Sequence, residues 1–470
     1  MKPIILTVAL SASLLTGCAV GPNYKRPVVD APTVHRNPEG DETAAASNSL
    51  AEKPWKEVFN DPVMHQLVET ALTDNFDLRI ATERIAQARA QYGISTSRLY
   101  PTVDGQLKFT SQRGSSAGSI IFVPKGTNLD VSYTDGGGLL NWELDLWGRL
   151  RRLRESARAQ YLATEEARHA VQTSIVADVS FAYLQLRELD LELEIAEKTR
   201  KIAEDGLRLT QLRRGSGVAT GLDVRQAETL LYTATSQLAE TRRAIEQQEN
   251  AIRFLLGGSP GSVERGKPLG EIVVPDAIPA DIPSALLDRR PDIRQAEQQL
   301  VSANAQIGAA KAQYFPKISL TSAVGGQSRA LSDLFTGPAR LWSFSPGVTV
   351  PIFNAGRIRN DVRYTEAMQR EAEINYQKTI QTAFREVSDS LIAYTHLQEQ
   401  REQQQLLVTS LRESARLSNS RYRGGLDSYL QVLDAERNLF NGEMVLAQLQ
   451  LAELNSVVQV YRALGGGWQQ

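Results

Sequence analysis

The sequence is poor in the residues that hold covalent or metal-bound cores. Of 470 residues, one is cysteine and four are histidine, so we expect no disulfide within the fold, no cysteine-based zinc site and no cysteine nucleophile. Lysine plus arginine number 52 against 54 aspartate plus glutamate, which gives no electrostatic basis for binding nucleic acid. The composition argues against metalloproteins, thiol enzymes and nucleic-acid-binding proteins.

The sequence also lacks long hydrophobic runs beyond its first 17 residues. A helix needs roughly 18 to 20 mainly apolar residues to cross a bilayer. We therefore expect that any membrane crossing by this chain uses β-strands.

The N-terminus resembles the signal of a bacterial lipoprotein. Lys2 precedes a short apolar run from Ile4 to Leu15, which is typical of a signal peptide over 1–17. The small residues before Cys18 resemble a lipobox, in which that cysteine is acylated and becomes the first mature residue. A plain signal peptide with an incidental cysteine is the alternative. Ala19, in place of an aspartate that retains many lipoproteins at the inner membrane, favours the outer membrane, and 18–54 reads as an extended arm.

The rest of the chain is an internal repeat. The segment Asn75–Pro101 matches Arg290–Pro316 at an offset of 215 residues, and Leu256-Gly257-Gly258 matches Leu464-Gly465-Gly466 at an offset of 208. We therefore predict a first repeat over 55–258, a linker over 259–282 and a second repeat over 283–470.

Each repeat has the same predicted order of elements. A helix (75–98 or 290–314) ends before a proline, and two strand-like runs follow (within about 101–146 or 316–353). Two long helices then occupy about 148–256 or 355–464, turning at Gly215-Ser216-Gly217 or Arg423-Gly424-Gly425. Apolar residues in these helices recur at coiled-coil spacing, and about 66 residues span on the order of 100 Å, so the helices must project far beyond a bilayer.

Four strands cannot close a membrane barrel, for which about eight is the minimum. Open strand edges in lipid would leave backbone groups unpaired. The strands therefore predict an oligomer, with eight strands in a dimer and twelve in a trimer. A soluble hairpin packed on helices would fit the same alternation.

Two glycine-rich segments mimic nucleotide-binding motifs. Gly261–Lys267 has Walker A spacing, but Pro268 replaces the required Ser or Thr. Gly215–Gly221 follows a helix, not a strand, and reads as a turn. No catalytic constellation, metal site or cofactor site stands out, and we predict no enzyme activity.

The doubled architecture, the lipobox and the segment from Ile282 to Ile293, which contains Leu-Leu-Asp-Arg-Arg-Pro-Asp-Ile, resemble the TolC/OprM-type outer-membrane factors, specifically their lipoprotein branch. The resemblance covers essentially the whole mature chain. It implies a mainly α fold with a β-barrel portion: a homotrimer whose twelve strands form an outer-membrane barrel that continues into a periplasmic α-helical barrel. It also implies docking on a periplasmic adaptor and an inner-membrane transporter of the resistance-nodulation-division type, with drug or solute export as the function.

The resemblance further implies a gate at the periplasmic tip. It assigns Leu430 to an apolar constriction, Asp434 to an acidic ring, and Tyr422 and Arg437 to ties between neighbouring helices. Leu430, Asp434 and Arg437 also share one helix face by spacing, although a solvated helix surface is the usual meaning of such a pattern. In the first repeat, Leu222, Gln226 and Thr229 occupy the matching positions. The implied adaptor-docking tips are Gly217, Val218, Ala219 and Thr220, and Gly425, Leu426, Asp427 and Ser428.

Two other functions fit the sequence. A type I secretion conduit would use the same fold with a different pump, although the lipobox and arm favour the efflux branch. A structural periplasmic coiled-coil lipoprotein would have no lumen. Neither the exported compound nor the cognate pump is encoded in these patterns.

Overall fold

The computed structural model describes residues 19–30, 32, 36, 50, 53–58, 60–115, 127–272 and 283–468. Cys18 and the signal peptide lie outside the described residues, as does most of the arm and residues 273–282 of the linker. The chain forms two compact units: the first combines 1–27, 85–164 and 296–376, and the second combines 28–84, 165–295 and 377–470. Each unit takes segments from both repeats, so a repeat is not itself a compact domain.

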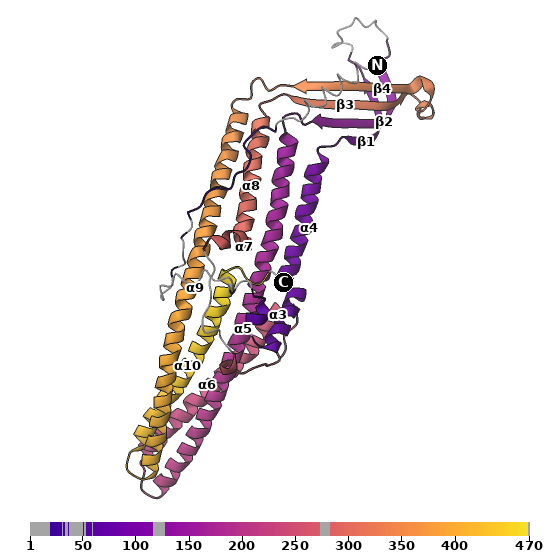
Figure 1. The fold of residues 1–470 in the computed structure, drawn as a ribbon. Helices are drawn as coiled ribbons and strands as arrows, with labels where there is room; N and C mark the ends of the chain where they lie inside the picture. Colours follow the sequence, from indigo (N-terminus) through magenta and orange to yellow (C-terminus); the bar gives the residue numbers. More distant parts are fainter. Residues whose placement is uncertain are drawn as a thin grey trace. The chain divides into compact units, whose positions relative to one another are not determined.

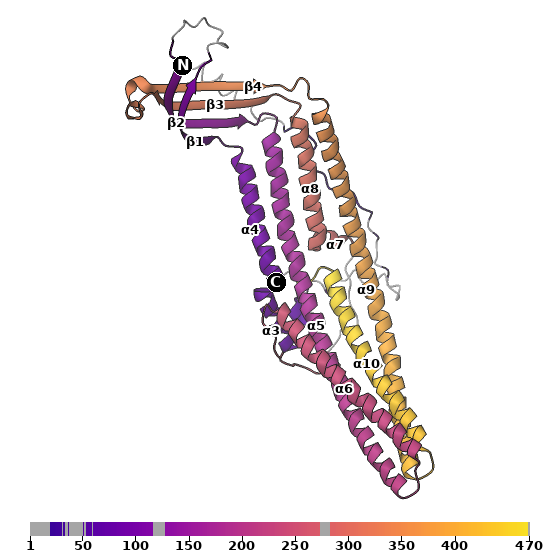
Figure 2. The same ribbon diagram turned by 180° about the vertical axis from the view of Figure 1, so that it is seen from behind.

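The helices follow the two offsets found in the sequence (Figure 1). Helix α4 (Phe76–Ser97) matches α8 (Pro291–Ala312). The long helix α5 (Arg149–Gly215) matches α9 (Arg357–Arg423), each with 67 residues, and α6 (Gly221–Leu255) matches α10 (Tyr429–Ala463), each with 35. In both views, α6 lies beside the lower part of α5, and α10 beside the lower part of α9 (Figure 2). Among the described residues, no helix is both long and apolar enough to cross a membrane.

Helix α3 (Pro62–Asp74) has no counterpart in the predicted order of elements, and the short helix α2 (Trp55–Val58) precedes it. Asp61 caps α3, and its carboxylate accepts hydrogen bonds from the backbone N–H groups of Val63 (2.8 Å) and Met64 (3.2 Å). Proline follows at the first helical position, which is a common helix start. This start was visible in the sequence as Asp61-Pro62 but was not used.

The same Asp61 carboxylate joins α3 to the linker and to α5. Its other oxygen accepts hydrogen bonds from the Tyr183 hydroxyl (3.0 Å) and from the backbone N–H of Lys267 (2.9 Å). Asp61 is fully buried, and a Cβ on Gly266 would lie 2.3 Å from it. The segment with Walker A spacing is therefore a structural clasp, and its glycine at 266 gives the carboxylate room.

The strands form one antiparallel sheet in the order β1-β2-β3-β4. Their bounds are Thr102–Arg113, Asp130–Leu144, Lys317–Ser328 and Arg340–Thr349. Each repeat supplies one hairpin, and the β2–β3 pair joins the two hairpins. Among the described residues, β1 and β4 are edge strands that each pair on one side only.

The register separates an apolar face of the sheet from a polar one, because alternate side chains point to opposite faces. One face collects the following large apolar side chains: Val103, Leu107, Phe109, Leu140, Trp142, Leu144, Ile318, Leu320, Val324, Trp342, Phe344 and Val348. The other face carries mainly polar residues, among them Asp104, Lys108, Asp135, Glu143, Ser319 and Gln327. Phe109, Phe344 and Trp342 are 68%, 61% and 79% exposed in the single chain, so the apolar face has no covering layer of its own.

Residues 19–27 of the arm are fixed to the first unit. The buried Arg152 side chain donates hydrogen bonds to the carbonyls of Val20 (3.2 Å) and Gly21 (3.3 Å) and to Asn23 Oδ1 (2.8 Å). A Cβ on Gly21 would lie 2.4 Å from the Gly308 Cα. The arm is extended, as predicted, and here it is packed closely on α8.

Equivalent polar latches hold the end of the returning helix in both repeats. In the first, the Asn75 amide donates to the Leu255 carbonyl (2.7 Å). In the second, Arg290 occupies the same repeat position and donates to the Ala463 carbonyl (2.9 Å). Arg290 is 7% exposed and also pairs with Asp292 (2.7 Å) and Glu386 (2.8 Å). The Arg-Pro-Asp part of the diagnostic sequence segment therefore has a structural role.

A buried carboxyl pair lies on α5. Glu188 and Glu192 are 5% and 7% exposed, and the Gln448 amide of α10 donates to Glu192 (3.4 Å). Burial, followed by the charge and hydrogen bond of Glu192, raises the pKa of Glu188 to about 8. The pair therefore holds a proton at neutral pH.

This raised pKa predicts a pH dependence of stability. A carboxyl whose pKa is higher in the folded state stabilises the fold below its unfolded pKa, and this contribution is lost as pH rises through the folded pKa. We expect the thermal unfolding midpoint to fall between about pH 5 and pH 9. Glu188→Gln should flatten that decline and raise the midpoint at pH 8, measured by circular dichroism. The same slope in Glu188→Gln as in the unsubstituted protein would contradict the assignment; Glu240→Gln, at an exposed site, is the control.

Candidate functional site

The two turns between the paired long helices share one backbone motif. At the first, the N–H of Val218 donates to the Arg213 carbonyl and that of Gly217 to Arg214; at the second, Leu426 donates to Arg421 and Gly425 to Tyr422, all at 2.9 to 3.0 Å. Gly217 (φ 78°) and Gly425 (φ 73°) take the left-handed conformation that ends such helices. All the sequence-predicted docking residues lie in these turns, where Val218 is 73% and Leu426 71% exposed.

The two turns differ in how the next helix begins. Thr220 and Asp223 form a reciprocal capping box at the start of α6. Ser428 makes no side-chain cap at the start of α10. Instead, Arg421 pairs with Asp427 across the second turn (3.2 Å for the longer contact), and this hydrogen bond and charge lower the pKa of Asp427.

The predicted gate residues of α10 share one exposed face. Leu430 is 50% exposed, and the side chains of Asp434 and Arg437 are 56% and 64% exposed. Arg437 pairs with Asp434 within the helix (2.9 Å), and Asn438 donates to the same carboxylate (3.2 Å). On α6 the matching Leu222 is 66% exposed. Gln226 is half-buried, and Thr229 donates to the Arg225 carbonyl. Within the chain, Arg437 therefore binds its own helix.

Tyr422 lies apart from this face, in a buried cluster between α5, α9 and α10. It is 5% exposed, its ring contacts that of Tyr429 edge-on at 5.3 Å, and the Arg213 guanidinium of α5 lies 4.2 Å from its centroid. The Tyr422 and Thr210 hydroxyls are 3.5 Å apart. The sequence brought Tyr422 forward, but it did not reveal Arg213, Thr210 or Tyr429.

A glycine in α5 makes room for this cluster. A Cβ on Gly206 would lie 3.1 Å from the Tyr429 hydroxyl oxygen. Burial, together with Tyr422 and Glu436, raises the pKa of Tyr429 to about 12, so this hydroxyl stays protonated. The single glycine inside α5 was the available sequence signal, because glycine in a helix interior lowers stability unless packing requires it.

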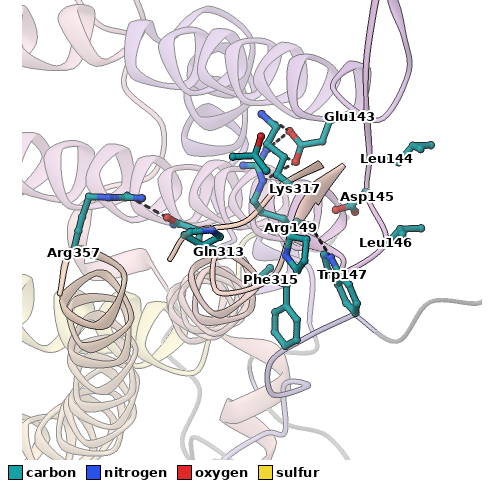
Figure 3. Close-up of a pocket in the computed structure, with 14 residues that line it drawn as sticks. Glu143, Leu144, Asp145, Leu146, Trp147, Arg149, Gln313, Phe315, Lys317 and Arg357 are labelled. Atoms are coloured by element: carbon teal, nitrogen blue, oxygen red, sulfur yellow. Dashed lines mark hydrogen bonds and ion pairs between the residues drawn. The ribbon is translucent and has the colours of Figure 1, made fainter. Parts of the chain in front are cut away.

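A cavity of about 430 Å³ lies where the sheet meets the helices of the first unit. Trp147 and Phe315 stack along it with ring centroids 4.8 Å apart. Arg149 (2.9 Å) and Lys317 (3.1 Å) both pair with Glu143 (Figure 3). These contacts tie the end of β2 to the starts of α5 and β3. The charged groups satisfy one another, so the cavity acts as a junction and presents no reactive group.

Within the described ranges, no group of three histidine, cysteine, aspartate or glutamate residues is placed to hold a metal ion. The arrangement offers exposed turns, an exposed polar helix face and a sheet with one apolar face. These are features for docking and conduction.

Comparisons with known proteins agree with this arrangement. The family model described as "Outer membrane efflux protein" matches residues 67–258 and 282–466. The "Probable efflux pump outer membrane protein TtgC" of Pseudomonas putida is 38% identical over 480 residues, which cover 100% of this chain and 97% of that protein. A crystal structure of a membrane protein from Pseudomonas aeruginosa has a TM-score of 0.87 and 34% identity, covering 95% of this chain and 100% of that one. The open state of the Neisseria gonorrhoeae MtrE outer membrane channel has a TM-score of 0.85 and 30% identity, covering 96% and 99%.

Proposed function

The chain belongs to the outer membrane efflux protein family, and from that premise we propose that it is the outer-membrane channel of a tripartite efflux pump. It conducts drugs or solutes passively from a periplasmic adaptor and an inner-membrane transporter of the resistance-nodulation-division type to the outside. It works as a homotrimer, has no enzyme activity and needs no cofactor.

The sheet carries this proposal. It has one apolar and one polar face, and its edge strands β1 and β4 each pair on one side only among the described residues. Unpaired backbone edges are too costly in hydrocarbon, so each β4 pairs with β1 of the next copy. Three copies give a twelve-stranded barrel with the apolar face toward lipid and the polar face toward the lumen. Acylation of Cys18 adds a lipid contact.

Conductance and mass test this function together. Purified protein should run as three chains after crosslinking in detergent and should form ion-conducting pores in a planar bilayer. A trimer without conductance would favour a structural lipoprotein, and two chains per particle would contradict the proposed barrel. Co-purification with a type I secretion pump would favour the secretion conduit.

The gate proposal places Leu430, Asp434 and Arg437 around the tunnel axis, with Leu222 and Gln226 between them, and gives Tyr422 the role of holding α9 against α5. The support is the exposed face on α10 and the buried tyrosine cluster behind it. The exposed turns containing Val218 and Leu426 receive the adaptor.

Loosening these contacts should open the tunnel. We expect Tyr422→Phe combined with Arg437→Ser to raise single-channel conductance, because a two-state equilibrium shifts tenfold for about 1.4 kcal/mol and three subunits contribute. Asp434→Ala should chiefly weaken cation preference, measured as reversal potential. Unchanged conductance in a correctly assembled double variant would show that these residues are an ordinary helix surface; Arg225→Ser on the exposed surface of α6 is the control.

A further inference from the structure

The connection between β3 and β4 folds back onto the apolar face of the sheet. Within residues 329–339, the backbone N–H of Thr336 donates to the Asp333 carbonyl (3.0 Å) and that of Ala339 to Thr336 (3.2 Å). Two short 3-10 turns, Leu331–Asp333 and Gly337–Ala339, shape it. We call residues 329–339 the flap.

A pair of glycines seats the flap. Gly136 on β2 and Gly326 on β3 are register partners on the apolar face. A Cβ on Gly136 would lie 3.0 Å from the Leu334 side chain, and one on Gly326 would lie 2.0 Å from the Leu334 carbonyl oxygen. Leu334 is 1% exposed. It fills the space that the missing side chains leave beside Leu107.

The flap turns two other apolar side chains outward. Leu331 is 64% and Phe335 85% exposed. They continue the exposed apolar face formed below them by Trp342 and Val324, which are register partners. The flap therefore extends the apolar surface of the sheet.

The height of the flap is set by strand geometry. Helix α8 ends just before β3, so β3 runs away from the helices. From Ile318 to Gly326 the strand rises about 27 Å, which a tilt of about 40° reduces to roughly 20 Å of height, near the top of the apolar band of about 25 Å in outer-membrane barrels. The exposed side chains of Arg329 and Arg340 border the flap, where phosphate groups of a membrane surface would complement their charge.

We propose that the flap is an interfacial membrane anchor: Phe335 and Leu331 insert among the acyl chains of the outer leaflet, and Arg329 and Arg340 bind phosphates of its anionic lipid, lipopolysaccharide. The inference rests on the proposed placement of the apolar face in lipid. It assigns the flap to the membrane surface and not to the mouth of the channel.

A fluorophore at a single introduced thiol tests the position of the flap. Phe335→Cys carries the environment-sensitive dye NBD, and the protein is reconstituted in phosphatidylcholine vesicles with brominated acyl chains. Phe344→Cys reports the apolar face, Val218→Cys reports a water-exposed turn, and the unsubstituted protein controls for labelling of Cys18. We expect the label at 335 to lose emission to bromolipid as it does at 344, and to resist iodide.

The outcomes separate the flap from the barrel. Bromolipid quenching at 344 together with iodide quenching at 335 would overturn the flap anchor and leave the barrel intact. Iodide quenching at both positions would overturn the placement of the sheet in lipid.

A second measurement tests the arginines. Lipopolysaccharide added to the protein in detergent should raise its thermal unfolding midpoint, and Arg329→Gln with Arg340→Gln should lose that shift. Arg208→Gln, on an exposed part of α5, should keep it. An equal shift in the double variant would remove the arginines from the proposed contact.

Discussion

Replacing Arg290 with methionine should destabilise the helical unit by about 3 to 5 kcal/mol, the usual cost of removing one partner from a buried ion pair. The guanidinium is 7% exposed and binds Asp292, Glu386 and the Ala463 carbonyl. Methionine fills similar volume but leaves two carboxylates and a helix-end carbonyl without their donor. Chemical unfolding followed by circular dichroism measures the loss.

A surface arginine provides the matched control. Arg200 pairs with Glu204 at 2.6 Å, but both side chains are 41% exposed, so Arg200→Met should cost less than about 1 kcal/mol. Adding Glu386→Met to Arg290→Met should recover part of the loss, because it removes a carboxylate that would otherwise stay unpaired. Equal effects at 290 and 200 would refute the latch.

Asp61→Ala is expected to cost about 4 kcal/mol, because a helix cap is worth about 1 kcal/mol and each buried donor left unpaired costs about 1 to 3 kcal/mol. The substitution leaves four donors without an acceptor: the N–H groups of Val63, Met64 and Lys267 and the Tyr183 hydroxyl. Helix α3 should lose its attachment first. Limited proteolysis between α2 and α4 would detect this.

Two variants separate the cap from the clasp. Thr220→Ala removes the exposed cap of α6 and should cost about 1 kcal/mol. Asp61→Asn keeps an oxygen for the cap but brings an amide N–H against the Lys267 N–H, so its loss should fall between those of the other two variants. If Asp61→Ala is no more costly than Thr220→Ala, the clasp contributes nothing.

Local sequence signals predicted most of the fold. The offsets of 215 and 208 residues place the ends of α5 and α9 and the starts of β1 and β3 within one or two residues. Glycine turns and prolines mark these ends through backbone sterics alone. The ends of β4 were less certain: it was expected over 341–353, but pairing ends at Thr349.

Contacts between distant segments were not visible in the sequence. Nothing near Tyr422 indicates that Arg213, 209 residues earlier, lies over its ring. The flap depends on Gly136 and Gly326, which come together only when β2 pairs with β3. Helix α3 is different, since its Asp-Pro start was present but the search for repeats passed over an element with no matching copy.

The two latches bear on symmetry. Each chain contributes one helical hairpin held through the neutral Asn75 and one held through the charged Arg290. In the proposed trimer, six hairpins form a ring that is sixfold in shape but only threefold in energy, with neutral and ionic latches in alternation. Acid that protonates Glu386 weakens every second latch and leaves the others unchanged. A tunnel built this way dilates through alternate hairpins, passing through a triangular intermediate before it becomes round.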